Sequence, residues 1–127
     1  MGSWQSLGVV ALGGAIGAIA RHGVVLALAG LTRAGLPWGV LAANVGGCFV
    51  AGLLFVLLSE RTGVDPLWRL LLAVGFLGAF TTFSAFSVDT LVLMQGGQLA
   101  RAALNVLANV GLCLLACGLG MGLARQL

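Results

Sequence analysis

Polar side chains interrupt an otherwise apolar stretch between residues 75 and 87. Within its last eight residues, 80–87, lie four hydroxyls and three phenylalanine rings: Thr81, Thr82, Ser84, Ser87, Phe80, Phe83 and Phe86. Gly78 followed by two threonines weakens a helix, and the hydroxyls can bond backbone groups that a break would free. Freed carbonyls suit a cation and hydroxyls suit an anion, so the stretch predicts an ion pathway. A kinked helix with hydroxyls bonded to its preceding turn is the alternative.

A second set of polar side chains recurs at every fourth position near the end of the chain: Arg101, Asn105, Asn109, Cys113 and Cys117. At 3.6 residues per turn they form one slowly drifting stripe along a helix. Asn44 lies in an earlier apolar stretch, and its amide carries two N–H donors that suit a desolvated anion. Buried asparagines need partners or water. They predict a track that lines a pore, or hydrogen bonds between helices.

The phenylalanines and Arg21 admit two interpretations each. Phe80, Phe83 and Phe86 would lie near one face of a continuous helix, where rings usually pack in a core. Beside a polar path, their positive ring edges could instead face an anion. Arg21 could attract anions, or could anchor the end of a helix by extending its side chain toward the membrane surface, which we favour.

The composition excludes a water-soluble globule. Of 127 residues, 61% are hydrophobic and 7% are charged, whereas soluble domains are about a quarter charged. Four apolar stretches cover roughly residues 6–29, 38–58, 67–95 and 100–123, and each reaches the ~20 residues that cross a bilayer. We therefore expect an all-α membrane protein. Its single transmembrane domain, residues 1–127, would have four transmembrane helices, the third of them broken at mid-membrane.

Catalysis and cation exchange find no support among the residue types. His22 is the one histidine, and no nucleophile–base pair suggests itself, so we expect no enzyme. A small drug or cation exporter would require an embedded carboxylate, and residues 6–29 contain none. The three cysteines lack the clustering of a metal site, so packing is their default interpretation.

The six arginines give little indication of orientation. Arg61, Arg69 and Arg125 fall on one expected side of the membrane, and Arg33 and Arg101 fall on the other. Since orientation follows the Lys/Arg bias between loops, so weak a bias favours insertion in both directions.

Small residues four apart suggest close helix packing. The pairs are Gly13 and Gly17, Ala43 and Gly47, and Gly118 and Gly122. In lipid, such pairs let backbones approach closely. Because four short-looped helices cannot enclose a wide pore, we expect an oligomer.

Three segments resemble the Fluc/CrcB family of fluoride channels: residues 13–21, 38–47 and 75–87. The resemblance extends over the whole chain in length, helix count and motif order. It implies a channel in the inner (cytoplasmic) membrane that exports fluoride passively. It also implies an antiparallel homodimer of dual topology with two pores.

The same resemblance assigns roles to individual residues. It places Asn44 on the fluoride path, with Phe83 and Phe86 presenting ring edges and Thr82 and Ser84 contributing donors. A structural sodium ion would be held at the dimer centre by the carbonyls of Gly78 and Thr81. The fourth helix would supply a polar track of Asn105, Asn109 and Cys113. Asn105 stands where tyrosine is frequent in the family, and Asn109 and Cys113 stand where serines are frequent. His22 and Val40 likewise replace an aromatic residue and a threonine. One subunit of a heterodimeric channel is therefore an alternative.

Overall fold

The computed structural model describes residues 2–32, 35–60 and 63–127. Their regular elements are all helical and follow in this order: α1 Ser3–Ala27, α2 Ala29–Thr32, α3 Trp38–Phe55, the π-helical η1 Val56–Glu60, α4 Pro66–Trp68, the π-helical η2 Arg69–Leu77, α5 Gly78–Phe80, α6 Phe83–Gln95 and α7 Leu99–Ala124. Arg33 and Arg61, which entered the count of charges on each side, lie outside the described residues.

Four helical segments are long and apolar enough to cross a membrane: Ser3–Ala27, Trp38–Glu60, Pro66–Gln95 and Leu99–Ala124. The predicted all-helical chain with four spans is thereby confirmed. The first span begins at Ser3 rather than at residue 6, because the Gln5 side chain accepts a hydrogen bond from the Gly2 N–H and caps the helix. The third span begins at Pro66, where Asp65 accepts a hydrogen bond from the Leu67 N–H.

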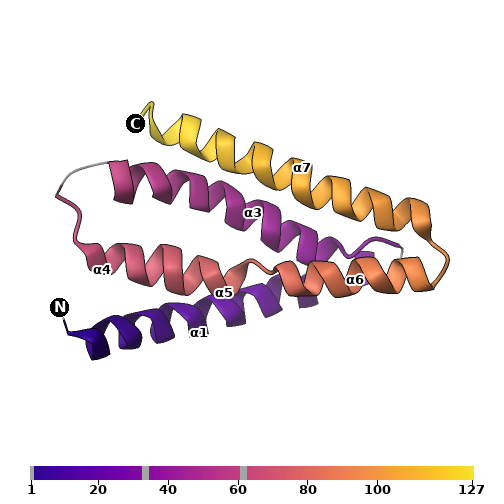
Figure 1. Cartoon of the computed structure of the whole chain (residues 1–127), viewed down its shortest axis with the longest axis horizontal. Helices are drawn as coiled ribbons and strands as arrows, with labels where there is room; N and C mark the ends of the chain where they lie inside the picture. Colours follow the sequence, from indigo (N-terminus) through magenta and orange to yellow (C-terminus); the bar gives the residue numbers. More distant parts are fainter. Residues whose placement is uncertain (1, 33–34, 61–62) are drawn as a thin grey trace.

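The helices lie side by side, with both chain ends at the same end of the molecule (Figure 1). The turn between α6 and α7 lies at the opposite end (Figure 1). Helix α3 packs mainly against α7, and α1 packs mainly against η2. This arrangement brings residues from the second, third and fourth spans together at mid-length, where α5 gives way to α6.

Glycines set how closely these pairs approach. Gly13 and Gly17 are buried, and a Cβ atom at either would overlap a backbone carbonyl of η2, as the pairing of small residues predicted. The predicted pair Gly118 and Gly122 is wrong for packing within the chain, since neither has an atom within 4 Å of an added Cβ. Gly120 faces α3 instead, because it lies on the buried stripe of α7.

The third span leaves the helical conformation between α5 and α6 (Figure 1). Thr81 (φ −83°, ψ 153°) and Thr82 (φ −150°, ψ 118°) are extended. The expectation that Phe80, Phe83 and Phe86 share one helical face is therefore wrong. The rings lie instead in two pairs: Phe76 stacks on Phe80 at 5.5 Å between centroids, and Phe83 meets Phe86 edge-on at 5.2 Å.

Candidate functional site

The side-chain amide of Asn44 on α3 pairs with the backbone of Thr82. The Thr82 N–H donates to Asn44 Oδ1 at 2.7 Å, and Asn44 Nδ2 donates to the Thr82 carbonyl at 3.1 Å. Both residues are buried. A buried backbone N–H and C=O need partners, and an extended residue outside any sheet has no strand to supply them. The Asn44 amide takes the place of that strand and stabilises the extended conformation.

Two backbone N–H groups near this pairing do not make their helical bonds. In a continuous helix each N–H bonds the carbonyl four residues before it, so the Thr82 N–H would reach Gly78. It donates to Asn44 instead. Likewise the Ala85 N–H, which would reach the Thr81 carbonyl, donates to the Thr82 hydroxyl at 3.2 Å and caps α6. The carbonyls of Gly78 and Thr81 thus lose the donors that a regular helix would give them.

The hydroxyls of this segment divide into two groups. Thr81 Oγ1 donates to the Leu77 carbonyl, and Ser87 Oγ donates to the Phe83 carbonyl, at 2.9 Å and 2.8 Å. For these two, the alternative interpretation of hydroxyls bonded to the preceding turn is confirmed. Thr82 Oγ1 and Ser84 Oγ lie 3.1 Å apart and bond each other. The Thr82–Ser84 pair carries two hydroxyl protons, and their mutual bond uses one of them.

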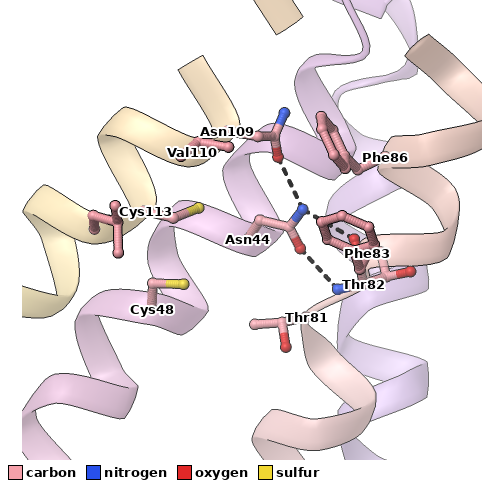
Figure 2. A pocket seen from close by; sticks show the side chains of 10 residues that line it. Asn44, Cys48, Thr81, Thr82, Phe83, Phe86, Asn109, Val110 and Cys113 are labelled. Atoms are coloured by element: carbon pink, nitrogen blue, oxygen red, sulfur yellow. Dashed lines mark hydrogen bonds between the residues drawn. The ribbon is translucent and has the colours of Figure 1, made fainter. Parts of the chain in front are cut away.

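A cavity of about 320 Å³ lies beside the Asn44–Thr82 pairing (Figure 2). Its lining consists of Asn44, Cys48, Thr81, Thr82, Phe83, Phe86, Asn109, Val110, Cys113 and Leu114. Among the described residues, no charged side chain lines it. The cavity therefore offers amides, hydroxyls, thiols and ring edges, which are neutral groups suited to an ion that must lose its water.

Most of the predicted site residues meet at this cavity. Figure 2 shows Asn44 between Asn109 of α7 and Thr82, with the rings of Phe83 and Phe86 beside them. Phe86 is buried, whereas the Phe83 ring is 77% exposed on the single chain.

Four predicted residues do not line the cavity. Asn105 is 1% exposed and lies behind Asn109, whose Nδ2 donates to the Asn105 side-chain oxygen at 3.0 Å. Ser84 is exposed and reaches the cavity only through its bond to Thr82. Gly78 is exposed on the adjoining turn. Arg21 lies on α1, away from the cavity lining.

A second cavity of about 390 Å³ adjoins the first, because Cys48 and Thr81 line both. It also contacts Gly78. It extends to Ser59, near the end of the second span, and to Arg69, near the beginning of the third. Together the linings of the two cavities extend from the polar centre of the chain toward the end of the bundle where Ser59 and Arg69 lie.

Sequence reasoning missed Cys48 and Thr90. Cys48 lies one helical turn after Asn44, a spacing that could have placed both on one face of α3. Thr90 is buried, accepts a hydrogen bond from Asn105 Nδ2 at 2.9 Å, and donates to the Phe86 carbonyl at 2.7 Å. Its position four residues after Phe86 was the available signal.

The donor set does not suit a transition metal. Within the described ranges, no group of three or more His, Cys, Asp or Glu side chains lies together. The freed carbonyls are the hard oxygen ligands available for a cation, and unwound backbone of this kind coordinates Na⁺ in other membrane proteins.

Comparisons with known proteins identify the family of this chain. Residues 8–121 match the family model described as CrcB-like protein, Camphor Resistance (CrcB). A protein of Magnetococcus marinus named fluoride-specific ion channel FluC is 49% identical over 116 residues, which cover 91% of this chain and 94% of that protein. A protein of the same name from Koribacter versatilis is 49% identical and covers 89% of this chain and 89% of its own length. Another from Vibrio campbellii is 43% identical and covers 99% of both. The chain belongs to the CrcB family.

Proposed function

We propose that this protein is a fluoride-selective ion channel that exports fluoride passively across the cytoplasmic membrane and confers fluoride resistance. The relatives named fluoride-specific ion channel support this over most of the chain length. The observation that carries the proposal is the neutral polar cavity beside the extended Thr82 backbone.

The cavity chemistry suits a small, strongly hydrated anion. Such an ion enters only where close donors replace its water. One proton of the Thr82–Ser84 hydroxyl pair is available, since their mutual bond uses the other. Phe83 and Phe86 line the same cavity, and the edges of their rings carry partial positive charge. Asn44 and Cys113 line the opposite side of the proposed path, with both Nδ2 protons of Asn44 held by Thr82 and Asn109.

The second cavity supplies the proposed entrance. Arg69 lies at its outer end, where a positive charge raises the local concentration of anions. Cys48 and Thr81 join this entrance to the first cavity. Within the described residues, neither cavity has a carboxylate in its lining, so no group there could couple fluoride to proton exchange. Transport along this path would be passive.

The proposed assembly is an antiparallel homodimer in which the third span is broken at mid-membrane. A sodium ion would be held at the dimer centre by the carbonyls of Gly78 and Thr81 from each copy, where it would balance charge. Support comes from the diversion of the Thr82 and Ala85 donors, which leaves these carbonyls free for a cation. The weak arginine bias supports insertion in both orientations. A heterodimer with a related chain is the second candidate, since it would use the same site.

Growth of a bacterium that lacks its own fluoride exporter tests the proposal. Expression of this chain should restore growth in millimolar fluoride, and the Asn44→Asp variant should not restore it at equal membrane abundance. If cells with the wild-type chain in their membrane stay as sensitive to fluoride as the host without it, export is contradicted. Restoration only on co-expression with a related chain would favour the heterodimer. A tag at the C-terminus should be labelled from both sides of the membrane, and labelling from one side would exclude a dual-topology homodimer.

A further inference from the structure

Five buried polar residues and the Phe86 carbonyl form one continuous series of hydrogen bonds that links α6 and its N-cap with α3 and α7. From the Thr82 N–H the series passes to Asn44 Oδ1 (2.7 Å), and from Asn44 Nδ2 to Asn109 Oδ1 (2.9 Å). It continues from Asn109 Nδ2 to Asn105 Oδ1 (3.0 Å) and from Asn105 Nδ2 to the Thr90 hydroxyl (2.9 Å). Thr90 then donates to the Phe86 carbonyl at 2.7 Å. The series therefore begins at the N-cap of α6 and ends on α6.

Both ends of this series force its direction. A backbone N–H can only donate, so at the Thr82 end Asn44 must present its oxygen. A backbone carbonyl can only accept, so at the other end the Thr90 hydroxyl donates to Phe86 and must accept from Asn105. Turning over any one amide would bring two donors or two acceptors face to face at two places. All five residues are buried, which makes such a mismatch costly.

This series of hydrogen bonds also uses the amide protons that could otherwise bind an ion. Asn109 Nδ2 donates to both the carbonyl and the side-chain oxygen of Asn105 at 3.0 Å. Asn44 Nδ2 donates to the Thr82 carbonyl and to Asn109 Oδ1. Since each Nδ2 carries two protons, both groups are fully engaged. Asn105 has one proton in excess of its bond to Thr90, but it does not line the cavity.

We infer that Asn109, Asn105 and Thr90 are positioning residues that fix the Asn44 amide in one orientation and thereby hold Thr82 extended, instead of contacting the transported ion. The inference rests on the proposed function, because it takes the cavity beside Thr82 to be the fluoride path. It favours hydrogen bonds between helices, the alternative left open by the sequence, over an ion-contacting track of Asn105 and Asn109. Its consequence is that a change at Thr90, remote from the cavity lining, alters the backbone at Thr82 through three intervening amides.

Thr90→Val tests this series of hydrogen bonds, because it removes the hydroxyl while keeping the shape of the side chain. The readout is hydrogen exchange of the Thr82 backbone amide, measured by NMR on the isotope-labelled protein in lipid nanodiscs. Exchange should accelerate by about fivefold to tenfold, the factor expected when one buried hydrogen bond is weakened. Thr90→Ser keeps the hydroxyl and should restore the wild-type rate. An unchanged Thr82 rate in a folded Thr90→Val variant would overturn the inference.

Ser87→Ala is the matched control. Ser87 lies on the same helix and also bonds the carbonyl four residues before it, but it is outside this series of hydrogen bonds. Its loss should leave Thr82 exchange unchanged. Equal acceleration in Ser87→Ala and Thr90→Val would mean that α6 as a whole is loosened, and would contradict a specific role for Thr90.

A fluoride titration separates positioning from direct contact. Side-chain amide resonances of Asn105 and Asn109 should keep their positions as sodium fluoride is added, while signals of Thr82 and Ser84 shift. Fluoride-dependent shifts confined to the two asparagines would overturn the inference. The exchange experiment needs no ion flux. A protein that passes no fluoride but shows the Thr90 effect would refute the proposed function and leave this inference standing.

Discussion

The side-chain amide of Asn44 satisfies both backbone polar groups of Thr82, a residue 38 positions later in the chain. One side chain on α3 thus determines the backbone conformation at the junction of α5 and α6. It does so by diverting the N–H that a regular helix would direct to Gly78. The Gly78 carbonyl thereby loses its helical donor, and the neutral cavity lies beside the pairing.

Asn44→Asp should remove the donating half of the pairing while barely changing side-chain size. A carboxylate can accept from the Thr82 N–H, but it cannot donate to the Thr82 carbonyl or to Asn109 Oδ1. A buried group left unpaired costs ~1–3 kcal/mol, so fluoride flux should fall at least about fivefold. Fluoride-electrode recordings from proteoliposomes provide the measurement. Gly46→Ala on the same helix, where an added Cβ meets nothing within 4 Å, should conduct normally. Normal flux in the Asn44 variant would exclude it from the site.

Phe83→Ile should reduce fluoride flux with little effect on the stability of the chain. Its ring is 77% exposed, so the substitution leaves no cavity in the core of the chain. Isoleucine offers no positive ring edge to an anion. Flux and thermal unfolding should be measured together, with Val92→Ala, another exposed apolar side chain of α6, as the control. Unfolding of the Phe83 variant at a lower temperature with unchanged flux per folded protein would show that the ring serves packing.

Gly17→Ala should destabilise the protein, because the new Cβ would overlap the Phe76 carbonyl of η2. Forcing these backbones apart should cost about 1–3 kcal/mol. Thermal unfolding in detergent provides the measurement. Gly23→Ala, on the same helix with open space at its Cβ, should be neutral or slightly stabilising, since alanine is the better helix former. Equal stability of the two variants would mean that α1 does not pack against η2 at Gly17.

Arg69→Gln should slow fluoride entry in a manner that depends on ionic strength. Arg69 is exposed at the outer end of the second cavity, where its charge would attract anions. The loss of flux should be clear at ~10 mM salt and should disappear near 1 M, where the Debye length is only about 3 Å. Arg101→Gln is the control, since Arg101 lines neither cavity. A defect that persists unchanged at high salt would refute the attraction and indicate a structural role.

Composition and hydropathy were sufficient to predict the four helical spans, because a lipid solvent leaves few alternatives for such long apolar stretches. The resemblance to the Fluc/CrcB family implied the grouping of Asn44, Thr82, Phe86 and Asn109, and these residues line one cavity.

The hydrogen-bond partners were not predictable from the sequence. A spacing of four residues identifies one face of a helix, but it does not say which neighbouring helix that face contacts. Asn105 therefore resembled a pore-lining residue until Thr90 was seen to accept its bond. The choice of Gly120 over Gly118 had the same cause, since both lie on α7 and only the crossing with α3 distinguishes them.

Ion flux through the purified protein tests the central claim most directly. Liposomes that contain only this chain and are loaded with potassium fluoride should release fluoride when valinomycin carries the potassium out. Liposomes loaded with potassium chloride should release almost no chloride under the same gradient. Release of fluoride with no measurable chloride release is the predicted result. Absence of fluoride release from liposomes that demonstrably contain folded protein, or equal release of both anions, would contradict the account.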